Sequence, residues 1–493
     1  MISFSVNFTN QLCLVLTWAG LSIFLYSFQL NATVAYLGLG LTVLLFLARP
    51  EQWGGVMGHD KLFWLWLLLI MVIVTSAASF SIIFPESGSD QWQSIKDWLN
   101  VLAFLPFGWQ VYVLRRRFMW MLVLMLLGIF TRILMHIDWG AMEYILEWPR
   151  QGFGLNPIVA GSIQGLAFTG LLVLGPKAFS GISIKRVSWA WVWYLCWCAG
   201  LCMLVESIIL TQTRAVWMAL FFCIPVSLVL QYRQAVRIQA DRIQMLLVCV
   251  ALFMCLVIIA LNLTIITQRA HEESAVVEGI PLVLSEGKST TAGRGASPDN
   301  GETSTDDSSP IRQQPASDLA ARANSAKPRW QIHQFPETSI GFRLMMWDIG
   351  FQAWLERPLW GWGVGGTEYV LKIADFPPLI VQGDPVFSHL HSAYIEMMVR
   401  FGVMGSLIFL VWFLLLMQSL SGACQYGLIS PEKTCFLIVG WLYFLLVAVF
   451  DFPIFKYAWR NYALIWLALS YAVHLEYLDH RTRKTVAISE SPT

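Results

Sequence analysis

Long apolar segments recur along the chain, and this recurrence restricts the sequence to a membrane fold. A helix needs about 20 mostly apolar residues to cross the hydrocarbon core of a bilayer. Charged residues make up only 13% of the 493 positions, whereas a soluble domain carries roughly a quarter. The sequence therefore predicts an all-α integral membrane protein with about 12 transmembrane helices. We place them near residues 11–30, 32–48, 62–83, 97–114, 118–137, 156–175, 188–209, 213–231, 244–266, 402–420, 433–451 and 459–476.

Basic residues gather on alternate connections between these segments, and this pattern predicts an orientation. Connections rich in Lys and Arg stay on the cytoplasmic side of a membrane. The other short connections hold only isolated basic residues at their margins. We therefore expect both termini in the cytoplasm and the long connection after the ninth segment on the opposite side. The basic connections carry Arg49, Lys61, Arg115, Arg116, Arg117, Lys177, Lys185, Arg186, Arg233, Arg237, Arg242, Lys433, Arg481, Arg483 and Lys484.

The long connection, residues 267–401, divides into two parts of different composition. Ser, Thr, Gly, Asp, Pro and Ala dominate residues 272–329, which lack the apolar density that offsets the entropy of ordering. We predict that this part is disordered. Aromatic and helix-patterned residues return in 330–401, which we expect to be structured and to carry the site. The other units are transmembrane helices one to nine in 1–266, helices ten to twelve in 402–478, and a cytoplasmic tail in 479–493.

Net charge and cysteine content exclude two classes of protein. The formal net charge is +1, and the basic residues are dispersed near the ends of apolar segments, so no global field would attract nucleic acid. None of the nine cysteines lies in the long polar connection. A disulfide framework or a zinc site needs paired thiols in polar loops. We therefore expect no nucleic-acid partner and no zinc–thiolate site.

Two histidines, His389 and His391, stand before a short helix that we expect to begin near Ser392 and to lead into the tenth predicted span at Gly402. A neutral imidazole can take a proton from a hydroxyl group near neutral pH, which makes His391 a candidate general base. The alternative is a histidine pair that only lies at the membrane interface. A metal site is a further alternative, but the sequence offers no third ligand near the pair at the usual spacing, and we expect no metal.

Two arginines are candidates for binding an anionic substrate. Arg214 stands at the start of the eighth predicted span, and Arg343 lies in the helix-patterned part of the long connection. Arginine stays charged, and its planar fork fits phosphate oxygens, so two of them could hold a diphosphate without a metal ion. The alternative is that each side chain only reaches toward lipid headgroups, as arginine commonly does at span ends.

Two further motifs are less specific. Residues 361–366 satisfy the letters of a G-x-G-x-x-G motif, but no strand precedes them as a dinucleotide-binding fold requires, so no nucleotide cofactor is expected. Gly361 and Gly363 instead predict a tight turn that brings the backbone close to another group, such as a ligand. Asn156, followed by a proline, opens the sixth predicted span, where a helix cap is the ordinary role. It could also face the same cavity.

These residues together resemble the superfamily of O-antigen ligases and polymerases, which are bacterial membrane glycosyltransferases. The likeness covers the number of spans, the large loop late in the chain, and an arginine at the positions of Arg214 and Arg343. The turn Pro358-Leu359-Trp360-Gly361-Trp362-Gly363 fits a family motif. The most specific match is His391-Ser392, then nine residues, then Gly402-Val403-Met404-Gly405.

The resemblance implies an O-antigen ligase of the bacterial inner membrane, with the long connection in the periplasm. Its donor would be a glycan on undecaprenyl diphosphate, its acceptor a sugar hydroxyl of lipid A-core, and membrane lipids would surround it. His391 would be the base, and Arg214 and Arg343 would bind the diphosphate. No cofactor or metal would be needed. Other substrate contacts would come from His389, Asn156, Gly361 and Gly363.

Three alternative functions share some of these features. Within the superfamily, a polymerase joins repeat units and an oligosaccharyltransferase modifies a protein hydroxyl, and both use the same donor. A transporter of lipid-linked sugars would also carry many spans and intramembrane arginines, but we find no internal repeat of the kind that such transporters show.

Overall fold

The structure is a computed structural model that is almost entirely helical in the residues that it describes. The one exception is an antiparallel pair of two-residue strands, β1 (Ile380–Val381) and β2 (Asp384–Pro385). The segment 272–329, which we predict to be disordered, lies outside the described residues. These are 2–140, 150–176, 189–237, 242–268, 330, 335, 339–374, 380–381, 384–385, 387, 389–451 and 456–489.

Most predicted spans coincide with a helix, as expected for apolar segments whose backbone groups must be satisfied internally. The helices in the first part of the chain are α1 (Ile2–Ser27), α2 (Ala32–Leu47), α3 (Pro50–Met57), α4 (Lys61–Ile83), η1 (Pro85–Ser87), α5 (Gly88–Leu102), α6 (Phe104–Val113), η2 (Arg115–Arg117) and α7 (Phe118–His136). They continue with α8 (Pro157–Leu174), α9 (Trp189–Leu210), α10 (Arg214–Arg237), α11 (Arg242–Leu261), α14 (Ser339–Glu356), α15 (Gly366–Ala374), α16 (Ala393–Gln425), α17 (Pro431–Phe450) and α18 (Tyr457–Ser489).

One predicted span, residues 97–114, is divided between α5 and α6, which meet at Ala103. Pro106 explains the break, because a proline has no N–H to donate to the carbonyl four residues earlier and its ring crowds that carbonyl. The carbonyl oxygen of Leu102 accepts a hydrogen bond from the Trp66 indole instead, at 2.8 Å. The sequence pattern did not distinguish this broken segment from a continuous helix.

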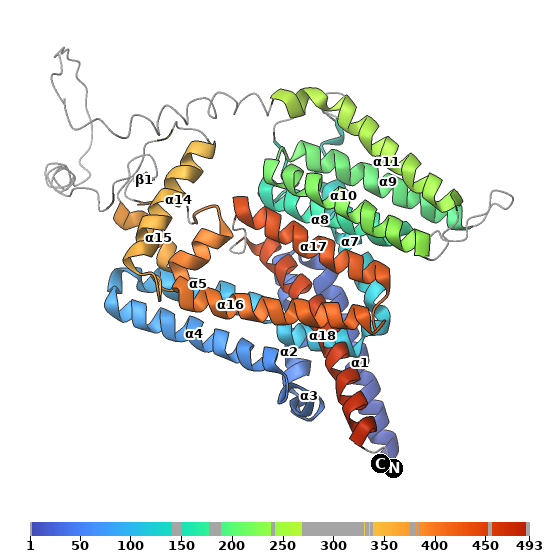
Figure 1. The fold of residues 1–493 in the computed structure, drawn as a ribbon, viewed down its shortest axis with the longest axis horizontal. Coiled ribbons are helices and arrows are strands. Elements are labelled where there is room, and N and C mark those ends of the chain that lie inside the picture. The colour runs from blue at the N-terminus through green and yellow to red at the C-terminus, as the bar shows by residue number, and fades with distance from the viewer. Residues whose placement is uncertain are drawn as a thin grey trace, which may run out of the picture.

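Seven of the described helices are long and apolar enough to cross a membrane, or up to eight if the bent pair α2 and α3 counts as one span. The described part of the chain thus has the apolar helices of a multi-pass membrane protein. Figure 1 shows α8, α9, α10 and α11 gathered beside α17, with α16 and α18 in the middle of the molecule. The helices α14 and α15 lie at one end, next to α5 and the beginning of α16.

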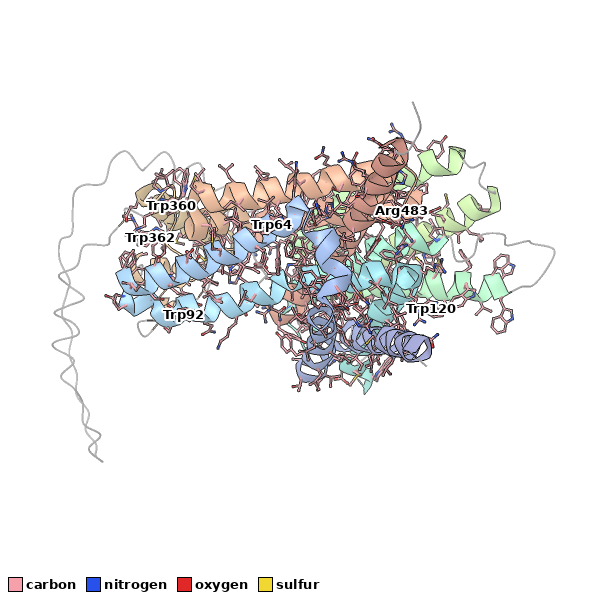
Figure 2. The ribbon with its side chains drawn as sticks, turned by 90° about the horizontal axis from the view of Figure 1, so that it is seen from below. Trp64, Trp92, Trp120, Trp360, Trp362 and Arg483 are labelled. Carbon is pink, nitrogen blue, oxygen red and sulfur yellow. The ribbon has the colours of Figure 1, made fainter. Side chains whose placement is uncertain are left out.

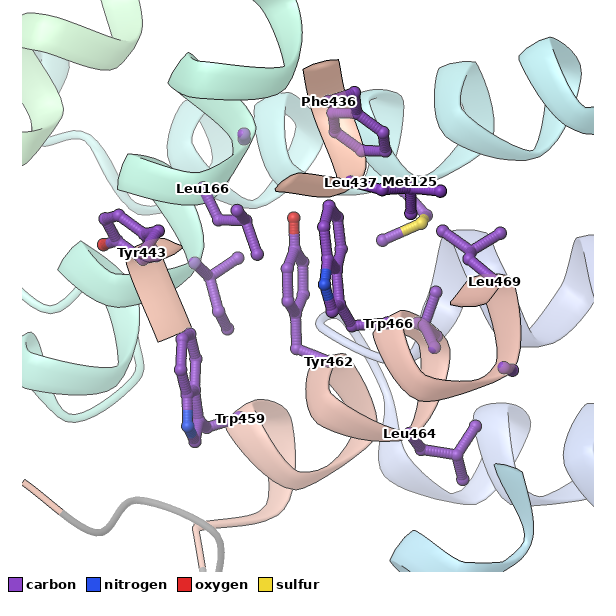
Figure 3. Close-up of a cluster of buried hydrophobic side chains, with 14 of the residues drawn as sticks. Met125, Leu166, Phe436, Leu437, Tyr443, Trp459, Tyr462, Leu464, Trp466 and Leu469 are labelled. Carbon is purple, nitrogen blue, oxygen red and sulfur yellow. The ribbon is translucent and has the colours of Figure 1, made fainter. Parts of the chain in front are cut away.

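Aromatic side chains of α18 pack against helices from distant parts of the chain. Tyr462 and Trp466 lie among Phe436 of α17, Leu166 of α8 and Met125 of α7 (Figure 3). The rings of Trp466 and Phe436 meet edge to face, with centroids 4.7 Å apart. Since lipid tails are as apolar as these side chains, close packing rather than exclusion of water favours this arrangement.

A second, smaller core lies under α14 and α15 and reaches the first turns of α16. Its buried members include Met346 and Ile349 of α14, Val370 of α15, and Leu390 and Val399 around the start of α16. This core fixes α14, which carries Arg343, against the segment that carries the two histidines. Arg343 and the two histidines are thus carried by segments that pack on one core.

Candidate active site

Two histidines and an aspartate form a buried cluster where α16 begins and α17 ends. Both His389 Nε2 and His391 Nδ1 lie 3.3 Å from the same carboxylate oxygen, Oδ1 of Asp451. The two imidazole centroids are 4.3 Å apart. The side chains of Asp451, His389 and His391 are only 5%, 8% and 12% exposed. Sequence analysis did not find Asp451, because it follows a different helix far along the chain.

The charge states of this cluster suit proton transfer. Burial lowers the pKa of His391, and this effect exceeds the opposing influence of Asp451, so the imidazole is neutral near neutral pH. Burial also opposes the ionisation of Asp451, but the two imidazoles beside it lower the pKa of this carboxyl below its ordinary value. If Nδ1–H of His391 faces the carboxylate, its Nε2 keeps a lone pair that can accept a proton.

The backbone of His391 is in an unusual conformation. Its φ is +52°, in the left-handed region that residues with a side chain rarely adopt. The adjoining backbone N–H of Leu390 donates a hydrogen bond to Glu396 Oε2 at 2.9 Å. Glu396 is fully buried and accepts a second hydrogen bond, at 2.7 Å, from Arg400 Nε. The buried Glu396–Arg400 pair therefore holds the histidine segment in a conformation that costs free energy.

A break in α16 follows this pair and explains the glycine-rich turn. Gly402 has φ +60° and ψ −165°, which interrupts the helix. The carbonyl oxygens of Val399 and Arg400 are then available to other donors. The backbone N–H groups of Trp362 and Gly363 donate to them, at 2.7 Å and 3.0 Å respectively. The glycine-containing turn at residues 361–363 and the break in α16 at Gly402 are thus held together by these hydrogen bonds.

Both glycines of the turn are required by this close approach. A Cβ on Gly361 would lie 2.5 Å from the carbonyl oxygen of Val399, and one on Gly363 would lie 2.6 Å from the side chain of Gln91. Both residues also have positive φ angles. The tight turn is therefore present, and it approaches α16 at Gly361 and Gln91 of α5 at Gly363. Neither glycine lines the arginine-rich pocket described next.

A small pocket beside Asp451 brings the two predicted arginines together. We call it the arginine pocket. Arg214 enters it from the first turn of α10, and Arg343 enters it from α14. Asp451 belongs both to this pocket and to the histidine cluster, so the two predicted halves of the site are adjacent. The lining residues are Arg150, Ile158, Gln212, Thr213, Arg214, Ala215, Arg343, Phe450 and Asp451.

Arg150 is a third arginine of the pocket. In the sequence it is only one of the isolated basic residues at the margins of the short connections. Its Nε donates a hydrogen bond to the carbonyl oxygen of Thr211 at 2.8 Å. Its Nη2 donates to Thr213 Oγ1 at 3.3 Å. These contacts fix the turn from which α10 begins, so Arg150 supports Arg214 through this turn. Its position before α8 gave no sign of this contact.

Asn156 has the ordinary role of a helix cap in the structure. The side chain of Asn156 caps α8 by accepting a hydrogen bond from the backbone N–H of Ile158 at 3.0 Å, and Asn156 does not line the arginine pocket. A substrate contact by Asn156 stays a prediction.

Burial lowers the pKa of Arg343, and Asp451 opposes this shift. A guanidinium nevertheless stays charged in proteins, so Arg343 presents a cation to the pocket.

Residues 199–410 match a protein family described as O-antigen ligase. The match covers less than half of the chain, so it shows a similarity to that family over these residues. The resemblance predicted from the sequence is thereby confirmed, and the family is glycosyltransferase-like. The matched range includes Arg214, Arg343 and both histidines, whereas Arg150 and Asp451 lie outside it. No curated protein matches the chain.

Proposed function

We propose that the protein is an O-antigen ligase that moves a polysaccharide from undecaprenyl diphosphate to a sugar hydroxyl of lipid A-core. The reaction would take place in the periplasmic leaflet of a bacterial inner membrane, in a chain of twelve spans with both termini cytoplasmic. The observation that carries this proposal is the position of Asp451. It touches the histidine pair and lines the arginine pocket, so a proton acceptor and a phosphate-binding group meet at one carboxylate.

The transfer has a balanced sequence of bond changes in this site. The acceptor hydroxyl gives its proton to Nε2 of His391 while its oxygen attacks the anomeric carbon of the donor sugar. The bond between that carbon and the diphosphate oxygen breaks, and undecaprenyl diphosphate leaves with the electron pair. Asp451 stabilises the imidazolium that forms and orients the ring, as a carboxylate does in a Ser-His-Asp triad.

The charge of the arginine pocket suits a diphosphate leaving group. Arg150, Arg214 and Arg343 provide three positive charges against the single carboxylate of Asp451. Guanidinium groups bind phosphate oxygens through paired, charge-assisted hydrogen bonds. Donors that are already in place stabilise the negative charge that develops as the sugar–phosphate bond breaks. The pocket can therefore stabilise the diphosphate as it departs.

A metal ion is the main alternative for the histidine cluster. One donor atom each from His389, His391 and Asp451 lie within 4.8 Å of one another, a spacing that could hold a cation. The nearby guanidinium of Arg343 argues against this, since it already acts electrostatically on both His391 and Asp451 and would repel a divalent ion. We favour the base role and expect transfer to survive a chelator.

A gel of lipopolysaccharide from a deletion strain, with and without the restored gene, tests the ligase assignment. Loss of the polysaccharide ladder with accumulation of lipid-linked polymer is the result that we expect. A band with a single repeat unit would indicate a polymerase instead. An unchanged ladder together with loss of glycan from a protein would indicate an oligosaccharyltransferase, whose donor chemistry is the same.

A further inference from the structure

The C-terminal half of α14 and the turn that follows it expose large apolar side chains. Phe351, Leu355, Leu359 and Trp360 are between 52% and 67% exposed. We call these four residues the outer α14 face. The opposite face of the helix is fully buried, as at Ile349. Exposed apolar side chains that gather in this way usually mark a surface that contacts another apolar phase.

Hydrogen bonds join this face to the membrane-spanning part of α16. The backbone N–H groups of Val403 and Met404 donate to the carbonyl oxygens of Pro358 and Leu359, at 2.8 Å and 3.1 Å respectively. The turn that carries Trp360 is therefore fixed where α16 resumes after its break. Figure 2 shows Trp360 at the end of the molecule where α16 begins.

From this point α16 carries a lipid-facing stripe. Met404, Leu407, Val411 and Leu414 follow a spacing of three to four residues and are 44% to 55% exposed. The helix is one of those that are long and apolar enough to cross a membrane. The backbone N–H of Met404 donates to the carbonyl oxygen of Leu359, so the outer α14 face lies directly beside the lipid-facing stripe of α16.

We infer that the outer α14 face is seated in the headgroup region of the bilayer, with Trp360 as its interfacial anchor. Indole rings favour this region because they combine a large apolar body with a polar N–H. The contact would hold the C-terminal end of α14 at a fixed depth. Arg343 lies near the other end of the same helix, so the lipid contact would also set its height above the membrane.

Photocrosslinking tests this contact without measuring enzyme activity. A benzoylphenylalanine replaces Trp360 in the full chain, reconstituted in nanodiscs of phosphatidylethanolamine and phosphatidylglycerol. Leu407 on the lipid-facing stripe is the positive control. Lys372 of α15, in the same subdomain and with a side chain 40% exposed, is the matched negative control. After irradiation, mass spectrometry of the tryptic peptides measures the phospholipid adduct at each position.

We expect phospholipid adducts at positions 360 and 407, and at least a tenfold lower yield at position 372. Adducts at position 407 alone would show a correctly inserted chain whose outer α14 face does not touch lipid, and this result would overturn the inference. Crosslinking of position 360 to a second copy of the chain would also overturn it, since the face would then be a protein interface. Because the readout is a covalent adduct, it stays informative even if the proposed transferase activity is wrong.

Discussion

Replacement of Asp451 by Asn removes the charge that connects the two halves of the site and keeps the size of the side chain. In the wild-type protein, Oδ1 of Asp451 lies 3.3 Å from both imidazoles. Asn cannot stabilise the imidazolium that forms when His391 takes a proton. It can also present its amide N–H to Nδ1 and so favour the wrong tautomer of the ring.

The expected loss of rate follows from this distance. Two unit charges 3.3 Å apart attract by about 5 kcal/mol at an effective dielectric constant of about 20. This energy is an upper limit, because the transition state transfers only part of the charge. A positioned general base contributes about 10²- to 10⁴-fold to a rate, and the loss cannot exceed the contribution of the base itself. We therefore expect Asp451→Asn to reduce the maximal transfer rate by about 10²- to 10⁴-fold.

The pH dependence of the transfer rate gives a second, independent test of these electrostatic contacts. Transfer needs neutral His391, so the rate falls as the pH drops through the pKa of this imidazole. Asp451 raises the pKa of His391, whereas Arg343 lowers it. The acidic limb of the rate profile should therefore move to lower pH in Asp451→Asn and to higher pH in Arg343→Gln, while Arg343→Lys keeps the charge and leaves the limb in place.

The assay is transfer by the purified protein from a lipid-linked donor to lipid A-core, measured between about pH 5 and 8, the range in which histidine titrates. Folding of each variant is checked by its elution as a single species in detergent. Limbs that move in the same direction in Asp451→Asn and Arg343→Gln would refute the electrostatic reasoning. An unchanged profile in both variants would exclude His391 as the group that titrates.

Three further predictions test the pocket and the orientation. Arg214→Ala and Arg343→Ala should each lose more transfer activity than the corresponding Lys variants, because lysine keeps the charge but not the fork; near-normal transfer in both Ala variants would leave only contacts with lipid headgroups. Arg150 should act partly through Arg214, so in a double-mutant cycle on the KM for the donor the two Ala changes should cost less together than the sum of each alone, whereas additive effects would make Arg150 an independent contact. A reporter fused after Arg117 should be cytoplasmic and one within residues 285–309 periplasmic, and the reverse result would invert the proposed topology.

Local patterns were sufficient to predict most of the helices but not every break. The apolar segment that became α17 is continuous and its helix was predicted closely. The segment 97–114 has a similar apolar content, yet it is divided near Pro106. Only the structure shows that the indole N–H of Trp66 donates a hydrogen bond to the carbonyl oxygen of Leu102. Gly402 likewise interrupts α16, because a partner turn supplies donors for the freed carbonyls. Such breaks depend on distant groups, which a sequence window does not contain.

The same distinction applies to the candidate site. His391, Arg214 and Arg343 were found from the chemistry of their side chains and their positions beside or between apolar segments, and each also lies in a motif that resembles the family. Asp451 follows an apolar segment with no polar neighbour before it, and it reaches the histidines only because α16 and α17 pack together. Arg150 likewise depends on the contact between its loop and the turn before α10. The positions of Asp451 and Arg150 in the site depend on packing between distant segments, which leaves no pattern in the local sequence.

Replacement of His391 by Ala tests the central claim most directly. The measurement is the transfer rate of the purified variant with lipid-linked donor and lipid A-core acceptor, with and without a chelator, beside His389→Ala as the matched control. We expect His391→Ala to lose at least about 100-fold in rate, His389→Ala to lose less, and the wild-type rate to be unchanged by the chelator. Full activity of His391→Ala would contradict the assignment of the base, and loss of wild-type activity on chelation would show that the cluster of His389, His391 and Asp451 holds a metal ion instead.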